Sequence, residues 1–204
     1  MTQLVAAMAI YPEWVKKAQA MLDEVCSANA ERMPTLDDRS KLPYITAVVK
    51  EGLRWRPFNQ LGQPHMLIQD DEYEGYRFLA GTQFTWNAYA IALSEENYEN
   101  PMQFMPERFM NGDLQNGLKG HWAFGAGRRV CVDYNVGMNN GWIFAACILY
   151  YFDIKQDPDF PIDTINTHWD ILESPPFKVI ITLRSQAHAD LIMRCSPEAL
   201  NADY

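Results

Sequence analysis

The strongest constraint on the fold lies in residues 124–137, which read FGAGRRVCVDYNVG. Glycines shape a turn before Cys131, and a long apolar segment follows that turn at once. Apolar side chains recur in the segment at helical spacing, which predicts a helix over residues 136–154. A cysteine just before a helix faces unpaired backbone N–H groups and the positive end of the helix dipole, so its thiolate form is favoured.

Three roles fit a cysteine in this position: a nucleophile, a redox switch or a metal ligand. A nucleophile needs a base, and the nearest histidine, His121, lies ten residues upstream. An iron ligand needs a glycine turn that allows close approach, a flat apolar side chain and a neighbouring cation. These needs are met by Phe124, Gly125, Gly127 and Arg129. The residues alone leave the three roles open.

Two earlier helices are predicted from proline starts. Pro12 opens a segment whose apolar residues keep helical spacing up to Val25, and Pro43 opens another that stops at Pro57. A short helix is expected over residues 88–94.

The apolar period changes to two between His65 and Trp86, which predicts a small antiparallel meander. A strand is predicted over residues 178–183. Residues 99–121 show little regular pattern, and a loop of this length is usually functional or braced by specific contacts.

These elements predict a mainly α fold with small antiparallel β-sheets, an α+β class, in one domain over residues 1–204. Its expected parts are a helical part over 1–60, a β-meander over 61–87, a short helix and long loop over 88–123, the cysteine loop and following helix over 124–152, and a C-terminal β region and tail over 153–204.

Composition excludes several classes of protein. The net charge of -9 and a pI near 4.9 argue against a nucleic-acid partner. We expect no secretory signal and no membrane span, because no basic segment precedes an apolar core and no run of about 18 apolar residues occurs. The four cysteines form no CxxC pair and no zinc spacing with the four histidines, which favours reduced thiols and a cytoplasmic location.

Two acidic–basic pairs occur in short motifs. Glu51 and Arg54 lie three residues apart on a predicted helix, close enough for an ion pair. Glu107 and Arg108 are adjacent in the long loop. Each pair alone is typical of a solvated surface pair worth about a few tenths of a kcal/mol.

In this order and spacing, the motifs EGLR, PERF and FGAGRRVC resemble the C-terminal half of a cytochrome P-450, a haem-thiolate monooxygenase. The likeness runs from about Gln3 to Ile192, and the segment PPFKVIITLRSQAHADLI resembles fungal members of secondary metabolism. The resemblance implies the C-terminal half of that fold, a haem cofactor with its iron, and oxidoreductase activity on a small natural product.

The resemblance also implies roles for single residues around the haem. Cys131 matches the axial thiolate ligand of the haem iron. Phe124 would pack on the thiolate side of the haem, and Gly127 belongs to the same binding loop. Arg129 and His65 match the partners of the haem propionates.

Other matched positions are structural or line the substrate pocket. Glu51, Arg54 and Arg108 match a buried charge triad, which would turn two weak pairs into one network that costs several kcal/mol to break. Residues 58–63 and 172–176 fall where the family lines its substrate pocket.

The chain departs from the family pattern in two respects. The signature F-x-x-G-x-R-x-C-x-G ends in glycine, where this chain has Asp133. At about 6 Å and an effective dielectric of about 20, its carboxylate and a thiolate would repel by roughly 3 kcal/mol. The opening segment MTQLVAAMAIYPEW corresponds to the stretch after the family's acid–alcohol pair, so we expect the distal half of the haem site to be missing.

Several functions follow from these observations. The first is a truncated cytochrome P-450-like protein of a natural-product pathway that is not a self-sufficient monooxygenase. The second is a cofactor-free cyclase or isomerase of pericyclic type, with His65, Arg129, Asp133 and Glu51 as candidate catalytic residues. The third is a haem-thiolate half completed by a partner chain or a second copy, whose contact would cover exposed apolar surface. A non-catalytic binding partner and a non-functional gene fragment are the remaining interpretations.

Overall fold

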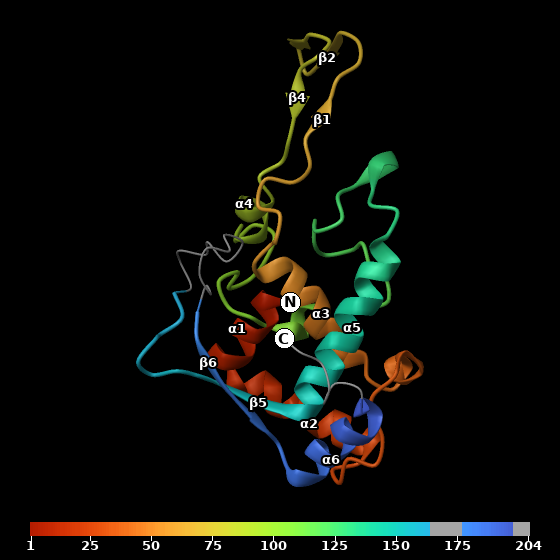
Figure 1. Ribbon diagram of the computed structural model, residues 1–204. Coiled ribbons are helices and arrows are strands. Elements are labelled where there is room, and N and C mark those ends of the chain that lie inside the picture. Colours follow the sequence, from red (N-terminus) through yellow and green to blue (C-terminus); the bar gives the residue numbers. More distant parts are fainter. Residues whose placement is uncertain (164–176, 198–204) are drawn as a thin grey trace.

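The computed structural model describes residues 1–163 and 177–197 (Figure 1). Its regular structure is mostly helical, with small two-stranded antiparallel sheets, so the predicted fold class is confirmed. The helices are α1 (Thr2–Ile10), α2 (Pro12–Cys26), α3 (Pro43–Trp55), α4 (Ala88–Ala92), α5 (Tyr134–Tyr151) and α6 (Gln186–Cys195), with short 3-10 helices η1 (Leu36–Ser40), η2 (Pro106–Phe109) and η3 (Gly127–Arg129). The strands are β1 (His65–Met66), β2 (Asp71–Tyr73), β3 (Tyr76–Phe78), β4 (Gln83–Phe84), β5 (Phe152–Gln156) and β6 (Val179–Leu183).

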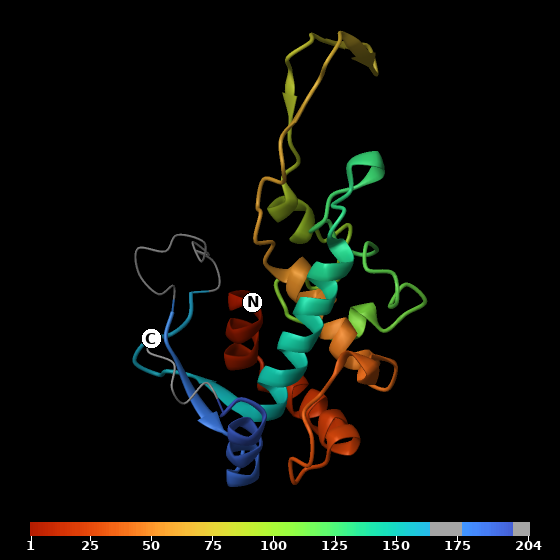
Figure 2. The same cartoon turned by 45° about the vertical axis from the view of Figure 1, so that its right-hand side comes forward.

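Helices α1, α2, α3 and α5 pack together around the hydrophobic core (Figure 2). Trp55 of α3 and Trp142 of α5 are fully buried. Phe104 meets Trp55 edge to face, with ring centroids 5.7 Å apart. Burying one large apolar side chain stabilises a fold by about 1.5–3 kcal/mol. This helical layer therefore fixes the side chains that α3 and α5 carry toward the candidate site.

Two core helices begin at the prolines that predicted them. Pro12 and Pro43 stand in the first turns of α2 and α3, where the missing backbone N–H leaves no hydrogen bond unmade. Helix α3 ends at Trp55, shortly before Pro57. The predicted short helix is found as α4, and the predicted strand over 178–183 as β6.

Residues 61–87 form a long arm that stands away from the helices (Figure 1). Strand β1 pairs with β4, and β2 pairs with β3 inside that pair. The predicted meander is therefore wrong in its pairing, because the strands are nested rather than joined in sequence. Glu74 and Gly75 both have positive φ at the tip, as the tight turn of a two-residue hairpin requires.

The long helix ends earlier than the apolar pattern indicated. Helix α5 stops at Tyr151, and Phe152–Gln156 form β5, which pairs antiparallel with β6. Pairing with a distant strand decides this boundary, which helical spacing alone cannot reveal. The predicted C-terminal β region also contains a helix, α6, whose first backbone N–H groups are capped by the side chain of Ser185.

Candidate functional site

The cysteine loop joins the long irregular segment to α5. Gly125 and Gly127 have φ of 72° and 65°, a left-handed conformation that other residues rarely adopt. The loop closes because the backbone N–H of Cys131 donates to the carbonyl oxygen of Phe124 at 2.9 Å. The Cys131 side chain is a free, exposed thiol. Figures 1 and 2 both show the loop at the upper end of α5, on the same side of the helices as the arm.

Phe124 packs onto the first turns of α5. A Cβ built on Gly137 would lie 3.1 Å from Cε1 of Phe124, so the missing side chain at Gly137 lets the ring approach the helix. The ring also meets Tyr134 and His121, with centroids 6.3 Å and 5.8 Å away. Phe124 is therefore held on two sides at the base of the cysteine loop.

Arg129 and His65, the two predicted propionate partners, lie on different elements. Arg129 ends η3 and is exposed, and its guanidinium has no ion pair or hydrogen bond with a described residue. His65 begins β1, where its ring meets Trp86 edge to face at 6.0 Å. A Cβ built on Gly125 would lie 3.6 Å from Trp86. Trp86, which was not predicted as a site residue, thus lies at the end of the arm, between His65 and the cysteine loop.

Asp133 is the N-cap residue of α5. Its carbonyl oxygen accepts the Gly137 N–H at 2.9 Å, and its side chain makes no capping bond. Its φ of −95° and ψ of 16° are open to any residue, so the backbone does not require glycine at this position. The carboxylate is exposed to solvent.

The three predicted triad residues lie together. Arg54 donates from Nε and Nη2 to the two carboxylate oxygens of Glu51, each at 2.8 Å. Nε of Arg108 lies 3.1 Å from Oε2 of Glu51. The side chains of Glu51 and Arg54 are fully buried and that of Arg108 is 11% exposed. The pair of Glu51 and Arg54 is therefore buried, unlike the solvated pair that its spacing alone would suggest.

This charge cluster also fixes the backbone of the long loop. Nη1 of Arg54 donates to the carbonyl oxygens of Ala92 and Pro101, at 2.8 Å and 2.9 Å. Oε1 of Glu51 accepts the backbone N–H of Met105 at 2.8 Å. The expectation that the long loop is braced by specific contacts is thereby confirmed.

Glu107 pairs elsewhere rather than with its neighbour Arg108. Its Oε1 lies 2.8 Å from Nζ of Lys17 and accepts a hydrogen bond of 2.7 Å from the hydroxyl of Tyr44. Burial and this hydrogen bond raise the pKa of Tyr44. The adjacent surface pair suggested by the sequence is therefore wrong: Glu107 connects the loop to α2 and α3, and Arg108 connects it to α3.

Two buried basic side chains were not revealed by the sequence. Lys50 is fully buried on α3, and its Nζ donates to the carbonyl oxygens of Asp113 and Asn116, each at 2.8 Å. Burial lowers its pKa. His121 is 5% exposed, and burial together with the nearby charge of Lys50 lowers its pKa to about 4. A charged residue beside a helix motif is ordinarily exposed, so no sequence signal marked Lys50.

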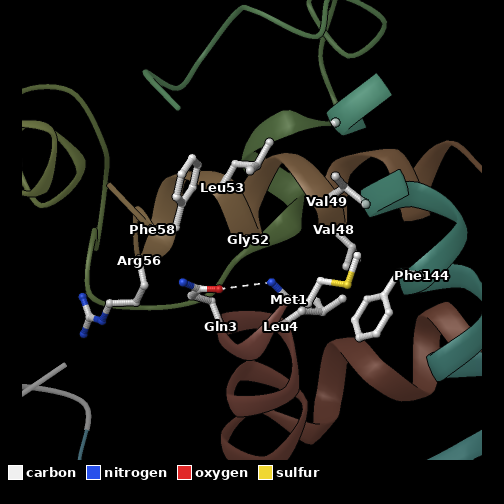
Figure 3. Close-up of a pocket in the computed structure, with 12 residues that line it drawn as sticks. Met1, Gln3, Leu4, Val48, Val49, Gly52, Leu53, Arg56, Phe58 and Phe144 are labelled. Carbon is white, nitrogen blue, oxygen red and sulfur yellow. Dashed lines mark hydrogen bonds between the residues drawn. The ribbon is translucent and has the colours of Figure 1, made fainter. Parts of the chain in front are cut away.

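A mainly apolar cavity of about 140 Å³ opens between α1, α3 and α5 (Figure 3). Phe58, in the first predicted substrate segment, lines this cavity, and the guanidinium of Arg56 points away from it. The second predicted segment, 172–176, lies outside the described residues. The wall is completed by side chains that include Leu4, Val48, Val49, Leu53 and Phe144.

Other kinds of site receive no support from the described residues. Within 1–163 and 177–197, no three His, Cys, Asp or Glu side chains gather as they would around a metal ion held by protein ligands alone. Nor does any helix in those ranges combine the length and apolar character needed to cross a bilayer.

The chain resembles curated cytochrome P-450 proteins along most of its length. The cytochrome P-450 family model matches residues 1–181. The cytochrome P-450 monooxygenase fsoB of Humicola fuscoatra is 38% identical over 203 residues, which are 93% of this chain and 37% of that relative. The monooxygenase claR of Ampulloclitocybe clavipes is 35% identical over 201 residues, covering 95% of this chain and 37% of claR. The chain thus spans just over a third of the length of these relatives.

A solved structure of the same kind has the same fold. A zebrafish cytochrome P-450 with abiraterone is similar at a TM-score of 0.74 and 29% sequence identity, over 89% of this chain and 42% of that one. The resemblance predicted from three short motifs, including its fungal character, is confirmed by these matches. Because the family model covers most of the residues and a solved member shares the fold, the chain belongs to the cytochrome P-450 family.

Proposed function

We propose that this chain forms the cysteine-ligand side of the haem site of a monooxygenase that acts on a small natural product. The observation that carries the proposal is the cysteine loop. Its thiol is exposed, its backbone is closed by the hydrogen bond from Cys131 to Phe124, and Phe124 is seated on Gly137. A loop that presents an exposed thiol from a hydrogen-bonded turn suits a cysteine ligand of haem iron.

The residues present fit a haem group. Gly137 leaves room for the flat ring of Phe124 at the base of the loop, and the thiol of Cys131 has no partner among the described residues. Asp133 adds a negative charge, but its carboxylate is exposed and its backbone is unstrained. Water screens an exposed charge strongly, so the repulsion falls well below the roughly 3 kcal/mol expected at an effective dielectric of about 20.

Each residue then has a defined task. Cys131 would hold the haem iron as a thiolate, and Arg129 and His65 would neutralise the haem propionates. A haem held there would supply the activation of molecular oxygen and the transfer of one oxygen atom to substrate. Phe124 supports the loop at its base, where its ring packs against Tyr134.

The apolar cavity beside α5 supplies the substrate side of the proposal. Phe58 and Phe144 line it, together with apolar residues of α3. Val132 and Val136, which are 89% and 56% exposed, extend apolar surface around the cysteine. Such surface is suited to contact with the cofactor and with further polypeptide. A lipophilic natural product fits this lining better than a charged substrate does.

A cofactor-free cyclase is the second candidate, and no observation favours it. It needs His65, Arg129 and Asp133 to act on one substrate. Within the described part of the chain these three side chains share no hydrogen bond, and all three are exposed. A cyclisation site instead needs polar groups that converge in a desolvated pocket.

An absorption spectrum tests the proposal. The purified chain is mixed with haem, reduced and exposed to carbon monoxide, and Cys131→Ser is measured beside it. We expect the red-shifted Soret band of thiolate-ligated carbonyl haem in the parent chain and its loss in Cys131→Ser. The matched control is Cys195→Ser, which removes another exposed thiol and should keep the band. A parent chain that binds no haem, or a band that survives in Cys131→Ser, would contradict the proposal.

A further inference from the structure

We infer that His121 is a positioning residue for Cys131: its ring wedges Phe124 against α5 and so holds the loop that carries the thiol. This inference rests on the proposed function, in which Cys131 must be held in place to bind haem iron. The packing around His121 can nevertheless be tested in the chain without haem.

His121 lies between two aromatic rings. Its ring centroid is 6.4 Å from that of Phe109 and 5.8 Å from that of Phe124, with interplanar angles of 63° and 64°. His121 is 5% exposed. The ring thus fills the space between η2 and the cysteine loop.

The shape of the His121 ring matters more than its hydrogen bonds. Nε2 of His121 is buried and makes no hydrogen bond of normal geometry with a described residue, although the nearby backbone of Gly117 acts to raise the pKa of the ring. Nδ1 accepts a long bond of 3.4 Å from the backbone N–H of Ala123. A buried polar atom without a partner costs free energy, so a histidine here contributes mainly by packing.

His121 is supported from α3 through Phe109 and Lys50. Phe109 is buried and lies against Lys50, whose Nζ is 5.2 Å from the ring centroid. The same ammonium holds the carbonyl oxygens of Asp113 and Asn116 at 2.8 Å. Phe109 therefore limits movement of His121 away from Phe124, because Phe109 itself packs against a lysine that is buried on α3.

Phe124 connects His121 to the cysteine. The carbonyl oxygen of Phe124 accepts the backbone N–H of Cys131 at 2.9 Å. On its other side, Phe124 meets α5 at Gly137 and Tyr134. We therefore expect a displacement of Phe124 to disturb the backbone group that fixes Cys131. Lys50, Phe109, His121 and Phe124 pack in that order, and the backbone hydrogen bond joins Phe124 to Cys131.

The test measures hydrogen exchange at the backbone N–H of Cys131 in the haem-free chain. The thiol is already exposed, whereas the backbone N–H is protected by its hydrogen bond to the carbonyl oxygen of Phe124. We expect His121→Ala to raise the exchange rate by about tenfold or more, because the cavity lets the loop open locally. His121→Phe keeps an aromatic ring of similar shape, so it should restore the slow rate.

The matched control is His188, a second buried histidine whose Nε2 also has no partner among the described residues. It lies on α6 and its ring meets Tyr150 at 4.8 Å, among the elements at the other end of α5. His188→Ala should lower the melting temperature without changing the exchange rate of the Cys131 backbone N–H. If His121→Ala lowers the melting temperature but leaves that exchange rate at the parent value, or if the rate rises equally in His188→Ala, the inference is overturned.

A spectrum separates this inference from the proposed function. If the chain binds haem, His121→Ala should convert part of the reduced carbonyl spectrum to the form without thiolate ligation, and His121→Phe should not. If the parent chain binds no haem, the proposed function fails, while the exchange rates of the Cys131 backbone N–H still decide whether His121 positions Cys131.

Discussion

Arg54 donates two hydrogen bonds to Glu51, from Nε and from Nη2, each 2.8 Å long, and neither side chain is exposed. The remaining nitrogen of Arg54 holds two carbonyl oxygens, those of Ala92 and Pro101, in the chain that precedes the cysteine segment. A single buried ion pair therefore connects α3 to the segment that leads to the candidate site.

Glu51→Gln should destabilise the chain by about 3–5 kcal/mol, because it leaves buried arginine charge without its counter-ion. Urea unfolding measures the free energy of unfolding. Asp70→Asn is the matched control: its carboxylate pairs with Arg77 at 2.9 Å, with side-chain exposures of 49% and 74%. An exposed pair of this kind contributes little because water screens it, and equal losses in the two variants would refute a buried triad.

Gly120→Ala should destabilise the chain by about 2 kcal/mol or more, since overpacking adds to backbone strain. Gly120 has φ of 79°, and a Cβ there would lie 2.6 Å from Cε1 of Phe109. Gly75 has φ of 81°, and a Cβ added there would meet no atom within 4 Å, so Gly75→Ala carries the strain alone. The difference in thermal unfolding between the two variants measures the contact with Phe109. Equal destabilisation in the two variants would mean that Phe109 moves aside without a measurable cost in stability.

Acid should weaken the fold through Asp38, which is buried. Hydrogen bonds from Arg32 lower the pKa of Asp38 from 3.8 to about 2. Because the folded pKa lies below the unfolded one, the pair stabilises the fold at higher pH, and about 2 kcal/mol is lost as pH falls from about 4 to about 2. Urea unfolding across that range measures the slope. Asp38→Asn should flatten it, and an unchanged slope would assign the acid sensitivity to other groups.

Asp133→Asn and Asp133→Gly should both bind haem about tenfold more tightly than the parent chain, since a charge of the same sign is removed from beside the thiolate. Titration of haem into each variant measures the affinity. Asn keeps the side-chain volume and Gly removes it. If only Asp133→Gly gains affinity, the volume of the aspartate side chain, rather than its charge, weakens haem binding in the parent chain. If neither variant gains, Asp133 does not repel the thiolate.

Local sequence patterns predicted the elements whose determinants are local. Pro12 and Pro43 mark the starts of α2 and α3 because proline fits only the first helical turn. The tight turn at Glu74 and Gly75 is likewise local, since its positive φ values are set by the turn residues themselves. The family assignment came from three motifs whose order and spacing are properties of the chain alone.

The candidate site was predicted only in part. Glu51, Arg54 and Arg108 form one largely buried charge cluster, in the manner that the resemblance implied. Cys131 and Phe124 are joined by a backbone hydrogen bond, and their roles at a haem stay predictions. Lys50, Trp86 and His121 were not predicted to take part. Each acts through neighbours that are distant in sequence, and no periodicity distinguishes a buried lysine from an exposed one.

The sequence by itself determined the helical class, the two proline-started helices and the cysteine loop with its aspartate. Only the tertiary structure decided where α5 ends, because β5 pairs with β6 across the chain. It likewise decided that Glu107 pairs with Lys17 rather than with Arg108, and that His121 lies between Phe109 and Phe124. The reason is the same in each case: the free energy of these contacts comes from desolvated packing between segments that meet only after folding.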